Sequence, residues 1–382
     1  MRLGEICVIN PKAPALDDDI NVSFVPMPKV GENGEFDPSE IKKYHEVKKG
    51  FTFFRDGDIL FAKITPCMEN GKGAIARSME NGIGFGSTEF HVLRPENNVV
   101  IGEWVYYLLN WSPFRKEAEK NMTGSAGQKR VPKSFLENFE IALPDTETQK
   151  NQVKTLQTLD ILIPLRKQQL AKLDELVKAR FVELFGDCNK QTSIKESGLT
   201  ISDGNYSSKY PRSEEFVESG IPFIRANNLK NGTVIDEDMY YITPEKHKIL
   251  LKGHLKPNDV LITTRGNIGQ VAIVPEKHND SNINAQIVLL RDENSRFIPQ
   301  YLLWALQTEE VKVQYLELQT GTALKQLPVG RLEQVKIKEP PIELQNQFAA
   351  FVEQTDKSKS AIQQSLDKLE TLKAALMQKY FG

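Results

Sequence analysis

The sequence predicts an α+β protein with two similar domains rich in β-strand, each followed by one long helix, so that the chain carries an internal pseudo-two-fold repeat. Three observations lead to this fold class. The chain of 382 residues exceeds the usual size of one hydrophobic core, its second half repeats features of the first, and two long segments show helical periodicity. We expect domains at residues 1–145 and 187–341, with long helices at 146–186 and 342–382.

The duplication is clearest where each half ends. Residues 141–186 align without a gap to residues 337–382, with 13 identities in 46 positions. Unrelated sequences would share only a few residues over this length, so the two segments are copies of one unit. The identical residues in the first copy are Ile141, Pro144, Glu147, Gln149, Asp160, Gln168, Leu170, Lys172, Leu173, Leu176, Ala179, Phe185 and Gly186.

Each copy predicts one amphipathic helix of about 40 residues, which would reach about 60 Å at ~1.5 Å per residue. Thr146 followed by Gln149 predicts a capping box at the first helix start, and Pro164 should kink or divide that helix. We expect the two apolar stripes to pack against each other as a coiled coil, the alternative being that each packs on its own domain. The predicted packing residues are Leu159, Ile163, Leu170, Leu173, Val177, Ile362, Leu366, Leu369 and Leu376.

The segments before the helices are also duplicated, more loosely. Residues 22–27 resemble residues 221–226, residues 57–61 resemble residues 258–262, and Thr123-Gly124-Ser125 resembles Thr320-Gly321-Thr322. Short β-branched and aromatic runs separated by Gly, Asn and Pro predict strands, with helical segments ahead of each Thr-Gly loop.

Composition excludes some classes and leaves one difficulty. No apolar run is long enough for a membrane span, the start lacks a signal peptide, and Cys7, Cys67 and Cys188 are too far apart for a disulfide framework or a zinc site. We therefore expect a cytoplasmic protein. The formal net charge of −2 gives no support to nucleic-acid binding, because such domains are usually basic.

The motifs taken together resemble the specificity subunits of type I restriction-modification systems, over essentially the whole chain. The resemblance is carried by Pro144, Glu147 and Gln149 with their long helix, by the twin motif at 340–345, by residues 220–232 and 259–261, and by the Thr-Gly loops. No single motif is specific to this family, but the duplication of the halves together with the two Pro-x-x-Glu-x-Gln helices is strong evidence for it.

The resemblance implies a function and partners. Two target-recognition domains would be separated by an antiparallel pair of helices, and each would read one half of a split sequence in double-stranded DNA. The helices would set the spacing and dock two methyltransferase subunits, which supply the S-adenosylmethionine chemistry, and motor-nuclease restriction subunits would join them. The chain itself would hold no cofactor. The first domain departs from the pattern, since Pro26-Met27 stands where the second has Arg225-Ala226, and residues 68–73 are extra.

Candidate base and phosphate contacts follow from side-chain chemistry. Arg and Lys pair with guanine, Asn and Gln pair with adenine, and glycine-bearing loops allow close approach to phosphate. Each candidate could equally be an ordinary exposed polar residue on a loop. The predicted DNA-binding residues are Lys63, Lys72, Arg77, Gln128, Lys129, Arg130, Arg225, Asn227, Arg265, Asn267, Lys325 and Arg331.

No catalytic, metal or nucleotide site is predicted. Residues 82–86 lack the spacing of a dinucleotide loop, and Pro144 with its acidic neighbours belongs to the helix start. His247 and His254 are seven residues apart with no third ligand nearby in the sequence. We find no methyltransferase Asn-Pro-Pro-aromatic motif and no ATPase loop, so the chain is expected not to be an enzyme.

Two other functions remain open from the sequence. One is an enzyme with its own active site, which turnover by the isolated chain would reveal. The other is a non-catalytic scaffold that joins partner proteins through its coiled coil, which the near-neutral charge permits.

Overall fold

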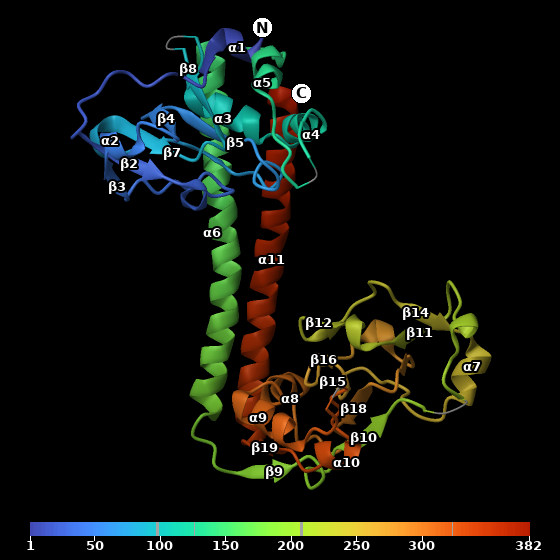
Figure 1. Cartoon of the computed structure of the whole chain (residues 1–382). Helices are drawn as coiled ribbons and strands as arrows, with labels where there is room; N and C mark the ends of the chain where they lie inside the picture. Colours follow the sequence, from blue (N-terminus) through green and yellow to red (C-terminus); the bar gives the residue numbers. More distant parts are fainter. Residues whose placement is uncertain (97–98, 126, 207–208, 323) are drawn as a thin grey trace. The chain divides into compact units, whose positions relative to one another are not determined.

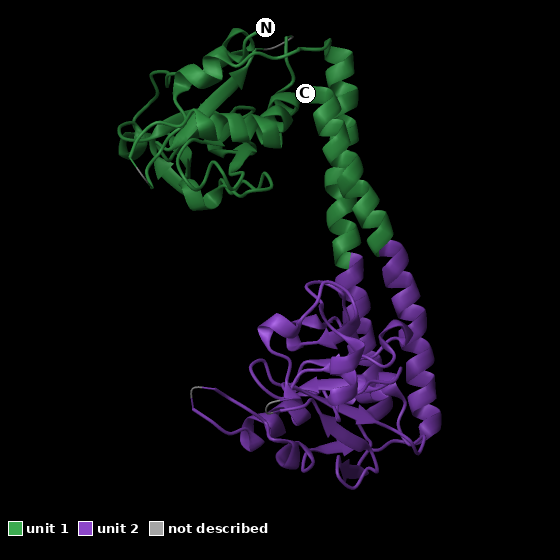
Figure 2. Ribbon diagram, turned by 90° about the vertical axis from the view of Figure 1, so that its right-hand side faces the viewer, with its two compact units in different colours: residues 1–168, 363–382 green, residues 169–362 purple. Residues whose placement is uncertain are grey.

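The computed structural model describes residues 1–96, 99–125, 127–206, 209–322 and 324–382. These form two compact units (Figure 2): residues 1–168 with 363–382, and residues 169–362. Each unit therefore contains part of both long helices. The domain boundaries drawn from the sequence follow the helix ends instead, and they remain a prediction.

The first unit contains two four-stranded sheets (Figure 1). One has the order β1-β8-β5-β6 with all neighbours antiparallel; in the other, β3-β2-β7-β4, only β2 and β7 are parallel. The strands are β1 (Cys7–Ile9), β2 (Asn21–Val25), β3 (Ile41–Lys43), β4 (Thr52–Arg55), β5 (Ile59–Ala62), β6 (Gly73–Ile75), β7 (Ile83–Gly86) and β8 (Phe90–Pro95). The α-helices are α1 (Leu3–Ile6), α2 (Tyr44–Val47), α3 (Gly102–Asn110), α4 (Ser112–Lys120) and α5 (Lys133–Asn138).

The second unit repeats this plan with additions. A six-stranded sheet has the order β10-β18-β15-β16-β13-β12, beside a three-stranded sheet β14-β11-β17 and the pair β19-β9. The strands are β9 (Gln191–Ser193), β10 (Thr200–Asp203), β11 (Ile221–Ile224), β12 (Leu229–Lys230), β13 (Thr233–Val234), β14 (Tyr240–Ile242), β15 (Val260–Thr263), β16 (Val271–Ile273), β17 (Asn282–Ile283), β18 (Ile287–Arg291) and β19 (Lys336–Lys338). The α-helices are α7 (Pro244–Ile249), α8 (Pro299–Ala305), α9 (Glu309–Leu318) and α10 (Val329–Leu332).

A buried ion pair marks the same place in both units. The Asp58 carboxylate accepts hydrogen bonds from Arg94 of β8, and the Asp259 carboxylate accepts them from Arg291 of β18; each pair has an N–O distance of 2.7 Å. Both aspartates are 1% exposed, so each carboxylate depends on its arginine for compensation. The turn before each needs a left-handed residue, supplied by Gly57 and Asn258. These matching details confirm the predicted fold class of a duplicated α+β protein.

The long helices are α6 (Thr146–Phe185) and α11 (Ile342–Phe381). Contacts within the first unit pair Asp160 with Lys373 at 2.6 Å and Lys167 with Glu370 at 2.8 Å. Within the second unit, Asp174 pairs with Lys359 at 2.6 Å, and the Phe181 and Phe348 rings are 5.3 Å apart. Residue numbers rise on one helix as they fall on the other, so the helices run antiparallel. Helix α6 continues through Pro164, so this proline does not divide it, and the alternative of a kink at Pro164 stays a prediction.

The buried amide of the Pro-x-x-Glu-x-Gln motif explains why both copies keep it. Gln149 Oε1 accepts from the Ile101 N–H at 2.9 Å, and Gln149 Nε2 donates to the Pro144 carbonyl at 2.8 Å. Gln345 makes the same two bonds, to the Ile298 N–H at 2.9 Å and the Pro340 carbonyl at 3.0 Å. Each glutamine thus fixes a long helix to the start of α3 or α8. The predicted capping box was therefore wrong.

The first helix is capped instead by Asp145, whose carboxylate accepts hydrogen bonds from the N–H and hydroxyl of Thr148 at 2.8 and 2.9 Å. At the C-terminal end of each long helix, the phenylalanine of the shared Phe-Gly motif packs against an aromatic residue of its own unit. Phe381 packs against Trp104 with ring centroids 5.0 Å apart, and Phe185 packs against Tyr301 at 4.8 Å. Among the described helices, none is long and apolar enough to cross a membrane.

Candidate nucleic-acid interface

In the first unit, the Thr-Gly loop packs against the segment that follows β5. The Val131 N–H donates to the Lys63 carbonyl at 2.9 Å, and the Thr65 N–H donates to the Lys129 carbonyl at 3.1 Å. The Lys63 N–H in turn donates to the Glu89 carbonyl at 2.9 Å. These bonds bring together five residues that we call the first loop cluster: Lys63, Glu89, Gln128, Lys129 and Arg130.

An ion pair between Arg130 and Glu89 neutralises one positive charge of this cluster. Arg130 donates two hydrogen bonds to the Glu89 carboxylate, at 2.9 and 2.8 Å, and one to the Gln128 carbonyl at 3.0 Å. The hydrogen bonds from Arg130 lower the pKa of Glu89, whereas partial burial lowers the pKa of Lys63. The guanidinium of Arg130 is thus already engaged, while Gln128 and Lys129 are exposed.

The second unit builds the same backbone frame with different side chains. The Leu327 N–H donates to the Thr264 carbonyl and the Thr264 N–H donates to the Gln286 carbonyl, both at 2.8 Å. Gln286 thereby takes the place of Glu89, and Gln326, which bridges to Thr320, takes the place of Arg130. We call this group the second loop cluster: Tyr206, Arg265, Asn267, Gln286, Lys325 and Gln326.

Arg265 supplies the guanidinium of this cluster. It is exposed, pairs in backbone register with Gln326, and lies over the Tyr206 ring with 5.0 Å between the guanidinium carbon and the ring centroid. Among the described residues, no carboxylate forms an ion pair with it. A stacked, uncompensated guanidinium keeps its planar set of donors free for a guanine edge or a phosphate.

The other residues of the first unit that were predicted to contact DNA lie away from the first loop cluster or already bind another residue of the chain. Arg77 forms a 2.6 Å ion pair with Glu103, and it follows β6, whereas Lys63 adjoins the opposite end of the β5–β6 hairpin. Lys72 is half-buried, and its ammonium donates to the Met27 carbonyl at 3.4 Å. The structure thus brings Gln128, Lys129 and Arg130 to Lys63 but does not bring Arg77 there.

Two predicted arginines of the second unit also have internal partners. Arg225 donates to the Asp238 carbonyl at 2.6 Å and stacks over Tyr240 at 3.4 Å, which fits a structural side chain. Arg331 of α10 donates to the Leu318 carbonyl at 3.2 Å but is otherwise exposed. Asn227 is exposed beside Arg225. Asn267 and Lys325 are exposed within the second loop cluster.

Sequence reasoning missed Glu89 and Tyr206. Each sits far along the chain from its arginine, so spacing alone gave no signal. For Glu89 a signal existed: it precedes β8 as Gln286 precedes β18, and comparison of the two halves at that strand would have placed them together. Tyr206 has no such counterpart among the motifs.

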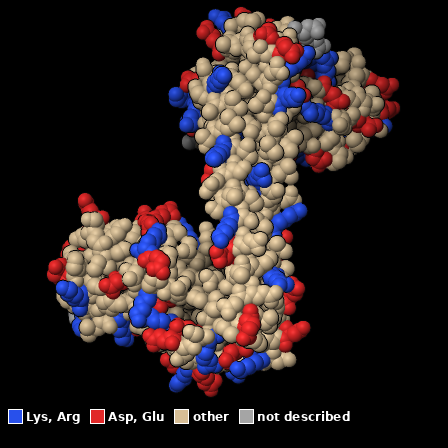
Figure 3. Space-filling model, turned by 180° about the vertical axis from the view of Figure 1, so that it is seen from behind, with Lys and Arg blue, Asp and Glu red and all other residues tan. Residues whose placement is uncertain are grey.

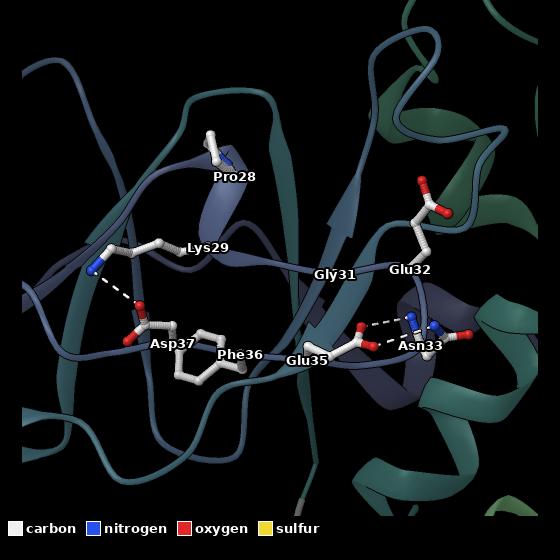
Figure 4. A pocket seen from close by; sticks show the side chains of 8 residues that line it. All are labelled: Pro28, Lys29, Gly31, Glu32, Asn33, Glu35, Phe36 and Asp37. Carbon is white, nitrogen blue, oxygen red and sulfur yellow. Dashed lines mark hydrogen bonds and ion pairs between the residues drawn. The ribbon is translucent and has the colours of Figure 1, made fainter. Parts of the chain in front are cut away.

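A pocket in the first unit does not suit DNA. It is lined by Pro28, Lys29, Gly31, Glu32, Asn33, Glu35, Phe36 and Asp37 (Figure 4). Its cation, Lys29, pairs with Asp37 at 3.3 Å, and the Glu35 carboxylate accepts a hydrogen bond from the Asn33 N–H at 2.9 Å. The remaining carboxylates would repel phosphate. On the face drawn in Figure 3, acidic and basic side chains intermingle on both units, in keeping with the net charge of −2.

The predicted packing residues of the long helices differ in burial. Leu159, Val177 and Leu366 are buried, and the half-buried ones are Ile163, Leu170, Leu173, Ile362, Leu369 and Leu376. Another set of apolar residues on α6 faces solvent: Ile161 is 62% exposed and Leu165 is 48% exposed. These lie one helical turn apart and form an apolar surface that no described residue of the first unit covers.

The chain is similar to known proteins both in sequence and in fold. The family model described as the type I restriction modification DNA specificity domain matches residues 1–175 and 199–371. The chain is 45% identical over 208 residues to the type I restriction enzyme EcoEI specificity subunit of Escherichia coli, covering 53% of this chain and 35% of that protein. It is 47% identical over 178 residues to the EcoAI specificity subunit of the same organism, covering 45% and 30%.

The chain thus spans about a third of the length of these two relatives. Its fold is similar to that of the type I restriction-modification S subunit from M. genitalium, with a TM-score of 0.59 and 15% identity, covering 100% of this chain and 95% of that one. Since the family model matches most of the chain in two copies, the chain belongs to the family of type I restriction modification DNA specificity domains.

Proposed function

We propose that this chain is the DNA sequence-specificity subunit of a type I restriction-modification complex, in which each half reads one half of a bipartite site. The observation that carries the proposal is the pair of loop clusters. They share one backbone frame, yet one presents Glu89 and Arg130 where the other presents Gln286 and Gln326. Equal frames with unlike polar side chains are what two readers of different half-sites require.

The long helices would dock the partner subunits. The exposed apolar surface at Ile161 and Leu165 offers area to a protein partner, and two methyltransferase subunits would bind along the helix pair. Those partners would supply S-adenosylmethionine chemistry, and motor-nuclease subunits would complete the complex. The chain would act in the cytoplasm and would contribute recognition without catalytic groups.

A protein-binding scaffold is the second candidate. The same apolar surface and the intermingled charges of Figure 3 favour it, because neither feature requires DNA. It differs from the main proposal in one outcome, since a scaffold would leave the sequence of methylated sites unchanged when the loop clusters are altered.

The proposal is tested by mapping methylated bases in genomic DNA from cells that hold the chain with its cognate methyltransferase, against cells in which only this chain is deleted. We expect methylation at one split motif to be lost on deletion. An unchanged methylation pattern, with the methyltransferase active and bound to this chain, would support the scaffold instead.

A further inference from the structure

Two histidines and one aspartate converge in the second unit, outside the loop clusters. His247 lies on α7, His254 follows that helix, and Asp280 precedes β17. His247 Nε2 is 3.3 Å from one Asp280 carboxylate oxygen, and His254 Nδ1 is 3.7 Å from the other. One ligand atom from each residue lies within 4.8 Å of the others. The third ligand that the sequence analysis did not find is therefore supplied by the fold.

Hydrogen bonds orient both rings so that one nitrogen of each ring faces the carboxylate. His254 Nε2 is 2.5 Å from the Leu250 carbonyl, which can only accept, so Nε2 carries a proton and Nδ1 is the nitrogen that faces Asp280. His247 Nδ1 is 2.5 Å from Oδ1 of Asn282, so Nε2 is the nitrogen that faces Asp280. Two imidazole nitrogens and a carboxylate then face one another, and either a proton or a metal ion can lie between them.

The distances suit a transition-metal ion. Bonds of about 2.0–2.2 Å in a tetrahedron separate ligand atoms by about 3.4 Å. The two rings lie 3.3 and 3.7 Å from different oxygens of Asp280, and the three ligand atoms lie within 4.8 Å of one another, so the side chains would draw together slightly around an ion. Metal-binding histidines usually donate their other N–H to a carbonyl or similar acceptor, as His254 does to Leu250. The Asp280 side chain is 70% exposed, which leaves an entry path and room for a water ligand.

We propose that His247, His254 and Asp280 bind one divalent ion of the zinc class, with water in the fourth position. The ion would join α7 and the loop after it to the segment that leads into β17. That strand pairs with β11, so the ion would stabilise the three-stranded sheet of the second unit. Its role would be structural, and it does not depend on the DNA-reading proposal.

The test uses the full chain, stripped with a chelator and then titrated with Co²⁺ and Zn²⁺. We expect one equivalent to bind, with the intense visible absorption of tetrahedral Co²⁺, and zinc to raise the melting temperature. Asp280→Asn should weaken binding by more than about tenfold, because it removes an anionic ligand from an exposed position without changing shape. His254→Gln should abolish the Co²⁺ absorption.

The matched control is His45→Gln, which changes an exposed histidine beside an aspartate in the first unit and should leave binding unchanged. Absence of the Co²⁺ absorption in the unaltered chain would overturn the proposal. So would equal binding by Asp280→Asn, which would place the ion elsewhere. If the melting temperature depends on pH but not on zinc, protons rather than a metal neutralise this cluster, and the proposal fails.

Discussion

The arginines of the two loop clusters differ in whether a carboxylate already binds the guanidinium group. Arg130 is held by two hydrogen bonds to Glu89, so binding a base would require it to give up or share that carboxylate. Arg265 has no ion-pair partner among the described residues and stacks on Tyr206, which restricts its side chain before any ligand arrives. Arg265 is therefore the better candidate for a base contact, whereas the position of the Arg130 guanidinium is set by Glu89.

Replacing Arg265 with Ala should weaken binding to the specific DNA site by about 10- to 100-fold, the usual value of one good base contact. Recognition should relax in only one half of the site. Binding of the assembled complex to specific and unrelated duplexes would measure this, with Arg77→Ala as the control, since Arg77 is ion-paired to Glu103 away from the cluster. Equal weakening on both duplexes would reduce Arg265 to a phosphate contact.

Replacing Glu89 with Gln gives the first cluster the residue type that the second has at that position. We expect the free energy of unfolding to change by less than about 1 kcal/mol, because the Glu89–Arg130 pair is partly exposed. The freed guanidinium should alter the bases accepted in one half-site, which methylation mapping would detect. A stable variant with an unchanged motif would show that this ion pair lies outside the reading surface.

At the scale of elements, two buried glutamines fix the long helices to the units. Gln149 and Gln345 make the same pair of bonds, in each case to a backbone N–H at the start of a helix and to the carbonyl of the motif proline. A buried donor or acceptor that loses its partner costs about 1–3 kcal/mol. The motif thus has a structural role, and it occurs twice because both long helices are attached to their units by the same hydrogen bonds.

Gln149→Ala and Gln345→Ala should each lower the free energy of unfolding by about 1–3 kcal/mol, which urea titration would measure. Gln157→Ala, at an exposed position of α6, should stay within about 0.5 kcal/mol of the unaltered chain. If the buried and exposed substitutions change the free energy of unfolding equally, the hydrogen bonds of the two glutamines do not hold the long helices to the units.

At the scale of the whole molecule, the sequence predicted the features that depend on local pattern. The duplication, the strand-rich halves and the long helices follow from periodicity and from residues such as Gln149 that recur at a fixed offset. What could not be predicted depends on partners distant in the chain. Glu89 meets Arg130 and His254 meets Asp280 only through the fold. Arg225 cannot be told from Arg265 until its hydrogen bond to the Asp238 carbonyl is seen.

The same limit applies to the helix start. Thr146 and Gln149 have the spacing of a capping box, but the helix uses Asp145 as its cap because Gln149 is drawn into the unit by backbone groups of the segment before α3. Tertiary hydrogen bonds outcompete the local motif wherever they satisfy otherwise buried groups.

If each half of the chain reads its own half of a split site, as we propose, the two halves can be exchanged separately. The decisive experiment replaces residues 187–336 with the corresponding segment of a family member of different specificity and then maps methylated motifs in cells with the cognate methyltransferase. We predict that one half of the motif changes while the other half and the spacing between them stay the same. A change in both halves, or none with methylation intact, would contradict the account.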